Sequence, residues 1–345
     1  MALGWFMRIV VFGGAGFIGS AVSRYLLSEG GAYVLVVDKV SHTSSLASLR
    51  AVAQSPRYGF RKADIRDRER IAGLIQAFAP DAIVHAAIEK STDRLIGAPA
   101  VDAGASLAGT SNLVDAAQAY WAALPAIRRE RFRFLAVSST AGVDQTADDN
   151  CASRIADRLV ATAHETYGLP AIVSKSDATY GPGQLPTEPV AAGIIAALDG
   201  EAFPADRALP ARLLHIDDHV RALALMLDKG TPGEIYAIPG ADVASAADLQ
   251  GCIERLAERH RPKDGSARAR LEAAAAAARS TVSRPSPAKA QDGCKLHEAT
   301  GWRPEHSLEA GLSQTLRWYL DNQSWWRPLQ AAQGAGNAYG IFRSA

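Results

Sequence analysis

The sequence predicts a doubly wound α/β fold, in which helices cover both faces of a parallel sheet, followed by a smaller C-terminal α/β domain. Three observations support this prediction. Short runs rich in β-branched residues alternate with longer helical patterns from Arg8 to about residue 175. A glycine-rich turn joins the first of these runs to the first helix. Beyond residue 175 the alternation weakens and prolines become frequent, so we place the domain change there.

Each element of the first domain is predicted from its own pattern. Apolar, β-branched runs such as RIVVF and YVLVVD predict strands at 8–12, 33–38, 58–64, 82–87, 131–139 and 169–176. Helical patterns between them predict helices at 21–30, 68–80, 105–124 and 150–167; Gly30 ends the first helix and Pro80 the second. The expected domains are 1–175, a substrate-type domain at 176–330 with parts of 211–240 returning to the first, and a tail at 331–345.

Composition excludes several classes of protein. The chain has 345 residues and is 48% hydrophobic, enough for two domains with a shared interface. Its formal net charge of +1 gives no global attraction to nucleic acid or to an anionic membrane. The three cysteines are widely spaced without a C-x-x-C pair, which argues against a disulfide framework and a zinc site. With no signal peptide and no run of 18 apolar residues, we expect a cytoplasmic protein.

Two C-terminal segments are biased in composition. Residues 262–291 are rich in Ala and then in Ser and Pro, which favours a helix and a spacer over a binding segment. Aromatic residues gather at 316–328, where packing onto the chain's own core is favoured over a docking face for a partner.

The stretch VVFGGAGFIGS has the chemistry of a dinucleotide-binding loop. It places Gly13, Gly16 and Gly19 between a strand and a helix, so that backbone N–H groups can approach a pyrophosphate at the helix N-terminus. Asp38 ends the second strand about 20 residues on, where a carboxylate binds ribose hydroxyls and repels a 2′-phosphate. The cofactor is therefore expected to be NAD rather than NADP, on a Rossmann-type domain.

The carboxyl ends of the third and fourth strands add to this site, because ligands bind at that edge of open α/β sheets. His85 is expected to be a core histidine rather than a catalyst. The predicted cofactor-binding residues are Gly13, Gly16, Phe17, Ile18, Gly19, Asp38, Lys39, Asp64, Ile65, Ala86 and Ala87.

Several motifs in order along nearly the whole chain, among them FAPDAIVHAA, LAGTSNLVDAAQAYWAAL, TYGPGQLP and TGWRPEHSLEAGLSQTLRWYL, resemble the extended short-chain dehydrogenase/reductases, in particular the dTDP-glucose 4,6-dehydratases. The resemblance implies an NAD-binding domain with a smaller sugar-nucleotide domain. It also implies a dTDP-sugar or another nucleotide sugar as ligand, and a dimer joined through the helices near 105–124 and 150–167.

The resemblance implies a three-step reaction. NAD takes hydride from the sugar C4 while a tyrosine removes the hydroxyl proton, an Asp–Glu pair helps to eliminate water across C5 and C6, and the hydride returns to C6. A lysine near the nicotinamide ribose lowers the pKa of the tyrosine, and the paired carboxyl groups divide the acid and base roles.

The segment after the fifth strand departs from this pattern. Ser139 can supply the hydroxyl of the family's threonine, but Thr140 and Ala141 stand where the Asp–Glu pair belongs. Neither can act as a carboxylic acid.

The family's Tyr-x-x-x-Lys is also missing. Depending on a one-residue gap, Asp149 or Asn150 stands for the tyrosine and Ser153 or Arg154 for the lysine. An arginine keeps the charge without the compact ammonium geometry. The candidate catalytic residues are Ser139, Asp149 and Arg154.

Further departures affect the substrate side. The matched positions carry Ser106 for an asparagine, Ala178-Thr179 for Asn-Asn and Thr187-Glu188 for Glu-Lys, and a glutamate in place of that lysine would repel a diphosphate. An Arg-rich nucleotide-holding run survives only in part at 284–289.

Two functional hypotheses follow. Losing one general acid or base costs about 10²–10⁴ in rate, and several such groups are missing here. The first hypothesis is therefore an NAD-binding, dehydratase-like protein that is impaired or inactive as an enzyme. It would act as a structural or regulatory partner in nucleotide-sugar metabolism. It would form a homodimer, or a heterodimer with a related dehydratase. The alternative is an active NAD-dependent nucleotide-sugar dehydratase or epimerase with substitute groups such as Ser139, Asp149, Arg154 or His164.

A histidine pair also invites a metal hypothesis. His215 and His219 are four residues apart, as metal ligands on a helix can be. The resemblance places no metal there, so none is expected, and Asp217 and Asp218 are predicted to be a helix N-cap and a first-turn charge.

Overall fold

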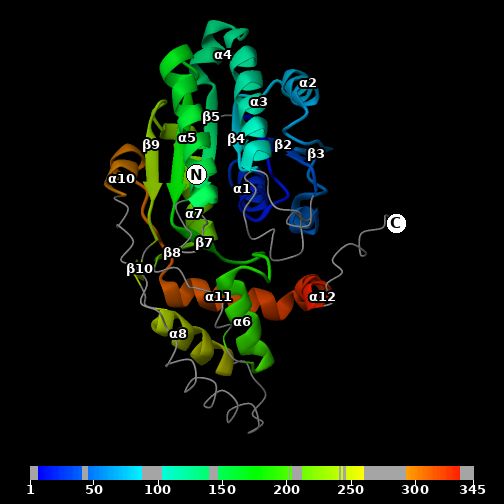
Figure 1. The fold of residues 1–345 in the computed structure, drawn as a ribbon, viewed down its shortest axis with the longest axis vertical. Helices are drawn as coiled ribbons and strands as arrows, with labels where there is room; N and C mark the ends of the chain where they lie inside the picture. Colours follow the sequence, from blue (N-terminus) through cyan, green and yellow to red (C-terminus); the bar gives the residue numbers. More distant parts are fainter. Residues whose placement is uncertain are drawn as a thin grey trace.

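The computed structural model describes residues 7–40, 46–87, 103–139, 147–201, 203, 212–240, 242–243, 246–259 and 293–334, and contains two sheets (Figure 1). The larger sheet has seven strands in the order β3-β2-β1-β4-β5-β6-β9, all paired in parallel. Their bounds are β1 Arg8–Phe12, β2 Tyr33–Asp38, β3 Tyr58–Lys62, β4 Ala82–His85, β5 Arg133–Ser139, β6 Ala171–Ser176 and β9 Ile235–Ile238.

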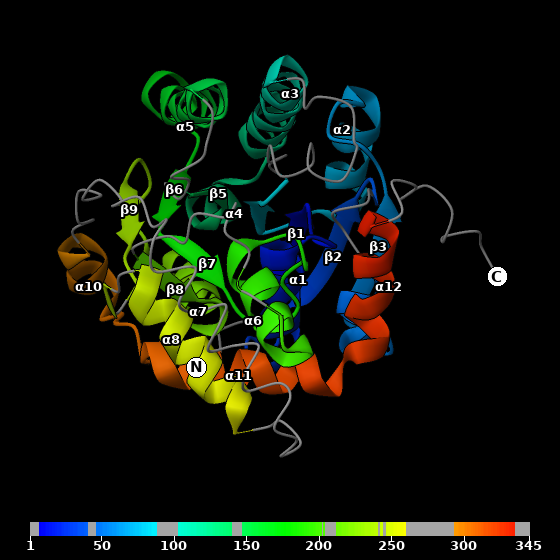
Figure 2. The same cartoon turned by 60° about the horizontal axis from the view of Figure 1, so that its bottom comes forward.

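Helices cover both faces of this sheet, as a doubly wound fold requires (Figure 2). The elements on one face are α1 Phe17–Ser28, η1 Leu46–Val52, α7 Ile216–Lys229 and α10 Cys294–Thr300, and those associated with the other face are α2 Arg68–Phe78, α3 Ala103–Ala122, α4 Ala126–Arg131 and α5 Ala147–Tyr167. Successive residues of β1 enter opposite cores, with Val11 on the α1 side and Phe12 on the α3 side, and both are 0% exposed. The predicted fold class is confirmed.

The first helix begins at Phe17 rather than at residue 21. Gly16 is its N-cap, and the Ser20 N–H donates to the Gly16 carbonyl at 2.9 Å. The helix therefore starts inside the glycine turn, which brings its N-terminus to the carboxyl end of β1.

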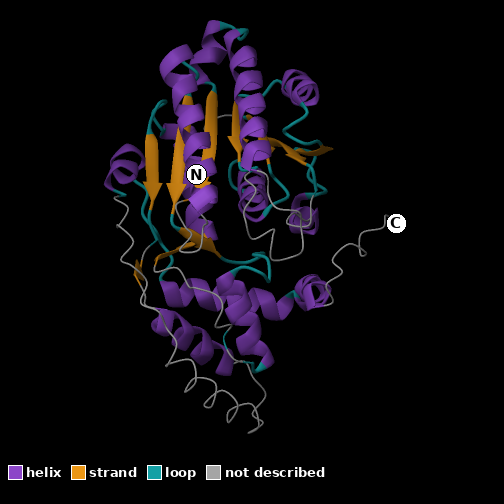
Figure 3. Cartoon of the chain, in the orientation of Figure 1, coloured by secondary structure: helices purple, strands orange, loops and turns teal. Residues whose placement is uncertain are grey.

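The smaller part is mainly helical and lies beyond the carboxyl ends of the large sheet (Figure 3). Its elements are β7 Ala178–Tyr180, β8 Arg212–His215, β10 Asp242–Val243, α6 Pro189–Asp199, α8 Ala246–Glu258, α11 Leu308–Asp321 and α12 Gln323–Gly334. Tyr319 and Trp326 are 0% exposed in its core. The C-terminal aromatic run thus packs inward at these two residues, as expected.

The chain crosses between the two parts more than once. β8 belongs to the small sheet, but α7, which follows it directly, packs against the large sheet, and β9 then pairs with β6 at the edge of that sheet. The biased segment 262–291 lies outside the described residues. Within the part of the chain that the structure describes, no helix is long and apolar enough to cross a membrane.

Candidate active site

The glycine turn is shaped by close approaches of backbone to backbone. Gly13 has φ +75°, and a Cβ at this position would lie 2.5 Å from the Ala87 nitrogen at the end of β4. A Cβ on Gly19 would lie 2.2 Å from the Gly13 carbonyl oxygen, whereas one on Gly16 would meet only that oxygen, at 3.3 Å. Gly13 and Gly19 therefore close the turn internally, and Gly16 keeps an open approach to the N-terminus of α1.

Asp38 ties the end of β2 to this turn. Its side chain is buried, with one carboxylate oxygen accepting from the Ala15 N–H at 3.0 Å and the other from the Val40 N–H at 2.7 Å. β2, β1 and β4 are neighbours in the sheet, so Asp38, Gly13 and Ala86 meet at one edge. This is the edge at which a dinucleotide's adenosine ribose and pyrophosphate would be held.

The remaining predicted cofactor residues lie around this edge. Phe17 and Ile18 begin α1 and pack partly buried on the core, and Lys39 follows β2. Asp64 forms an ion pair with Arg66 at 2.6 Å, and hydrogen bonds from Arg66 lower the pKa of this carboxyl. Ile65 contacts the helix α3 at Gly109, where an added Cβ would lie 2.6 Å from its side chain.

His85 has the environment of a core histidine, as expected. It is 2% exposed, its Nε2 lies 3.0 Å from the Thr110 hydroxyl, and burial lowers its pKa to about 4. This neutral, enclosed imidazole joins β4 to α3.

The candidate catalytic residues are not all brought together. Ser139 ends β5, and its hydroxyl donates to the Ser176 carbonyl at 3.4 Å. Arg154 is exposed on α5, and the side chain of Asp149, in the first turn of α5, falls outside the described part, as do Thr140 and Ala141 entirely. The catalytic roles of Ser139, Asp149 and Arg154 remain predictions.

His164 lies near the opposite end of α5 and is not recruited to this site. Its Nδ1 is 2.8 Å from the Leu169 carbonyl, and its ring packs against Gly233.

A polar cluster occupies the inner face of α5, above the ends of β5 and β6. The Ser153 hydroxyl lies 3.2 Å from that of Ser138, which in turn donates to Asp157 at 3.2 Å. The same Asp157 oxygen is 3.0 Å from the ammonium of Lys175 in β6. Ser153 rather than Arg154 therefore occupies the inward-facing position of the two that could match the family's lysine.

Lys175 is a functional candidate that sequence reasoning missed. Its signal was a charged residue inside the otherwise apolar or small strand AIVSKS. The Lys175 side chain is 31% exposed and that of Asp157 10%, so the ion pair is largely shielded from water. The four residues of this polar cluster offer two hydroxyls, a carboxylate and an ammonium, and none of them is a tyrosine.

The start of α7 differs from its prediction. His215, not an aspartate, is the N-cap: it has φ −67° and ψ 141°, and its Nδ1 accepts from the Asp217 N–H at 3.3 Å. Both Asp217 and Asp218 lie in the first turn, where carboxylates complement the helix dipole. The His219 Nδ1 lies 2.9 Å from the Thr179 hydroxyl, so His219 is not paired with His215 as a ligand.

The fold and the glycine turn together define a dinucleotide-binding protein of the Rossmann class. The model of the NAD dependent epimerase/dehydratase family matches residues 9–238, and the chain belongs to this family.

Within the family the chain is similar to dTDP-glucose 4,6-dehydratases. It is 34% identical over 342 residues to that of Neisseria meningitidis serogroup B, covering 93% of this chain and 95% of the relative. It is 32% identical over 349 residues to dTDP-glucose 4,6-dehydratase 1 of Escherichia coli K12, covering 92% and 94%. The crystal structure of DesIV (dTDP-glucose 4,6-dehydratase) from Streptomyces venezuelae with NAD and TYD bound has a TM-score of 0.75 at 29% identity, covering 94% of this chain and 100% of that one.

Proposed function

We propose that this protein uses its glycine turn and Asp38 to bind NAD, holds a nucleotide sugar of the dTDP-glucose type, and is impaired or inactive as a 4,6-dehydratase. Its role would be structural or regulatory, as a dimer with a second copy or with a related dehydratase in nucleotide-sugar metabolism. The cofactor edge, which keeps its glycines and its carboxylate, supports the first part of the proposal. The resemblance to the dehydratases, which sets Thr140 and Ala141 against the carboxylate pair, supports the second.

The physical argument concerns proton transfer. Neither a threonine hydroxyl, which ionises only far above neutral pH, nor an alanine methyl can replace a carboxyl group as general acid or base, and loss of one such group costs about 10²–10⁴ in rate. The tyrosine position is filled by Asp149 or Asn150. A carboxylate with an ordinary pKa near about 3.9 is a poor base for a sugar hydroxyl. Several such losses at one site need not multiply, but together they oppose turnover.

The exposed face of α5 supports a dimer. Ile155 is 46% exposed and Tyr167 59% exposed on this helix, and Ile127 in the neighbouring α4 is 64% exposed. A second chain packed against this part of the surface would cover some of these exposed apolar side chains. The partner would be a second copy or a related dehydratase.

Binding and the hydride step test this proposal separately. Calorimetry would measure NAD and dTDP-glucose binding, and absorbance of reduced nicotinamide would report hydride transfer after mixing the two with the protein. We expect NAD binding with no reduction above a protein-free control, while the Neisseria meningitidis enzyme, assayed alongside, serves as the positive control. Rapid reduction and turnover would overturn the impairment. Failure to bind NAD would overturn the proposal as a whole.

A second candidate is favoured by the polar cluster under α5. The ion pair between Lys175 and Asp157 brings an ammonium near Ser138 and Ser153, so an active enzyme with substitute groups would have a cation close to the family's lysine position. If activity is found, Lys175→Met should remove it, and Arg154→Met on the exposed face should not. The opposite ranking would assign the role to Arg154.

A further inference from the structure

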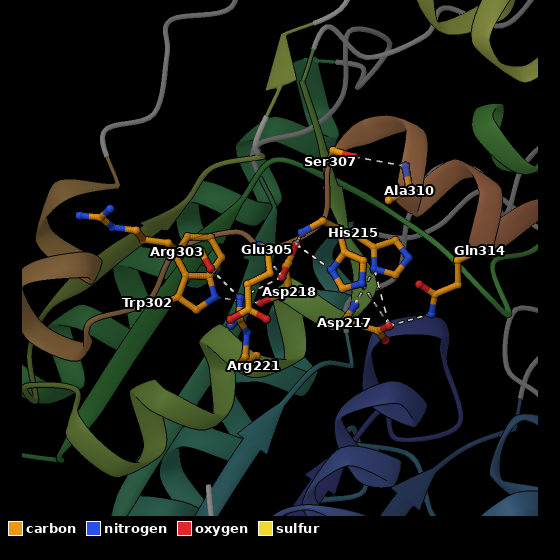
Figure 4. Close-up of polar contacts among 11 residues, drawn as sticks. His215, Asp217, Asp218, Arg221, Trp302, Arg303, Glu305, Ser307, Ala310 and Gln314 are labelled. Atoms are coloured by element: carbon orange, nitrogen blue, oxygen red, sulfur yellow. Dashed lines mark hydrogen bonds and ion pairs between the residues drawn. The ribbon is translucent and has the colours of Figure 1, made fainter.

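Two histidines and a carboxylate from two segments of the chain, His215, Asp217 and His306, meet at the start of α7. Figure 4 shows His215 beside Asp217. His215 ends β8, Asp217 lies in the first turn of α7, and His306 precedes α11. The Nδ1 of His215 is 3.7 Å from Oδ2 of Asp217, and the Nε2 of His306 is 3.9 Å from the same oxygen. One ligand atom from each residue lies within 4.8 Å of the other two.

The imidazole of His215 is incompletely satisfied by its protein neighbours. Its side chain is 1% exposed, and the ring nitrogen that faces Asp217, Nδ1, is the one that would bind a cation. The hydrogen bond that its Nδ1 accepts is long, at 3.3 Å. Because Nδ1 is the acceptor, the proton of the neutral ring is on Nε2, and this buried N–H has no hydrogen-bond partner among the residues that the structure describes. An ion bound at Nδ1 would take the place of the Asp217 N–H.

The surrounding residues orient the other two groups. Asp218 is buried, and its Oδ2 accepts from the backbone N–H of His306 at 2.9 Å and lies 3.1 Å from that residue's Nδ1. The His306 Nδ1 and the Asp218 Oδ2 are close enough for a hydrogen bond but are not aligned for one, and a small rotation of the ring would align them. A proton held on Nδ1 beside this carboxylate leaves Nε2 as the free ligand atom. On the other side, Gln314 donates to Asp217 Oδ2 at 3.0 Å and fixes its direction (Figure 4).

We propose that His215, Asp217 and His306 bind one divalent first-row transition-metal ion, for which zinc is the probe. Two imidazoles and one carboxylate suit such ions, and three protein ligands leave a coordination position for water. With metal–ligand bonds of about 2.0–2.1 Å, tetrahedral ligand atoms stand about 3.4 Å apart. The separations of 3.7 and 3.9 Å exceed this value, and the His306 ring, which stacks on that of His215 at 4.2 Å between centroids, would have to turn before its Nε2 faced the ion. The side chains of Asp217 and His306 are 51% and 26% exposed, so both have room to move.

Neighbouring cations limit the affinity. Arg221 forms an ion pair with Asp218 at 2.9 Å, and the charge of Arg24 is felt by Asp217. Both repel a dication, so we expect a dissociation constant on the order of micromolar rather than nanomolar. The ion would join the start of α7 to the segment that leads into α11, and would therefore hold the C-terminal helices against the larger part.

The experiment uses the full chain, stripped with a chelator and titrated with zinc chloride by calorimetry. Cobalt(II) serves as a second probe, because histidine and carboxylate ligation gives visible d–d absorption. The variants are His306→Gln and Asp217→Asn, both partly exposed. His297→Gln is the matched control, since His297 lies in α10 and its Nδ1 contacts the Trp302 carbonyl away from the cluster. Circular dichroism confirms that each variant folds.

We expect one zinc per chain, and a melting temperature raised by about 3–5 °C at a zinc concentration of 100 dissociation constants. Both variants should weaken binding at least about tenfold, and the control should bind as the unaltered protein does. The proposal fails if the unaltered protein shows no saturable binding up to about 100 µM zinc. It also fails if His306→Gln and Asp217→Asn both bind unchanged, which would locate the ion elsewhere. These outcomes are independent of NAD binding and of turnover.

Discussion

Two glycines of the cofactor turn, Gly16 and Gly19, allow the effects of a substitution on NAD binding and on stability to be measured separately. Gly16→Ala adds a methyl that meets only the Gly13 carbonyl oxygen, at 3.3 Å, and the backbone at φ −72° and ψ 175° accepts alanine. The free energy of unfolding should change by less than about 0.5 kcal/mol. The methyl occupies the approach to the α1 N-terminus, so NAD affinity should fall about 10- to 100-fold, or about 1.4–2.7 kcal/mol.

Gly19→Ala should instead affect both quantities. Its Cβ would lie 2.2 Å from the Gly13 oxygen and 2.8 Å from the Gly14 Cα, so backbone must move. Overpacking of this kind costs about 1–3 kcal/mol of stability. Gly73→Ala is the matched control: it lies in α2 with nothing within 4 Å of the added Cβ, and should raise stability by about 0.5–1 kcal/mol without changing NAD binding.

Urea unfolding and calorimetry with NAD measure the two quantities for all three variants. If Gly16→Ala binds NAD as tightly as the unaltered protein, the pyrophosphate does not bind at this turn. If Gly19→Ala is as stable as the unaltered protein, the close backbone packing is wrong.

Three further predictions concern the polar groups inside the fold. Burial lowers the pKa of His85 to about 4 from 6.5. The unfolded chain therefore binds more protons between these pH values, and the free energy of unfolding should fall by on the order of 3 kcal/mol as the pH drops from 6.5 toward 4. Urea unfolding measured across that range should give a shallower dependence of this free energy on pH for His85→Gln than for the unaltered protein. An equal dependence would refute the assignment. Asp218→Ala leaves Arg221 and the N–H groups of Glu305 and His306 without their buried carboxylate, and should cost about 3–5 kcal/mol of unfolding free energy; a loss under about 1 kcal/mol would contradict this. Lys175→Met leaves the carboxylate of Asp157 without its ion-pair partner and should cost about 1–3 kcal/mol of unfolding free energy. Much of this loss should be recovered in the double variant with Asp157→Asn. Additive losses in this double-mutant cycle would show that the two side chains are not coupled.

Local patterns predicted the architecture well because parallel strands are buried on both faces. Runs such as RIVVF and YVLVVD are continuous in apolar residues, and the glycine spacing fixed the strand, turn and helix around Gly13. Asp38 was predictable for the same reason, since the end of the second strand must lie beside the turn.

Contacts between distant segments were not predictable. The sequence shows Lys175 in a strand but does not show that Asp157 of α5 lies over it. Likewise, the sequence shows His219 four residues after His215, but it does not show that His306 stacks on His215 with 4.2 Å between the ring centroids. The N-cap of α7 was misassigned because histidine is an uncommon cap, while aspartate is a preferred one.

We infer that a preserved NAD-binding edge adjoins a catalytic position that lacks the family's proton-transfer groups. NMR of the purified protein incubated with NAD and dTDP-glucose tests it most directly, with NAD binding confirmed on the same sample by calorimetry. We expect bound NAD and no 4-keto-6-deoxy product above a protein-free control. Formation of that product over many turnovers would contradict it.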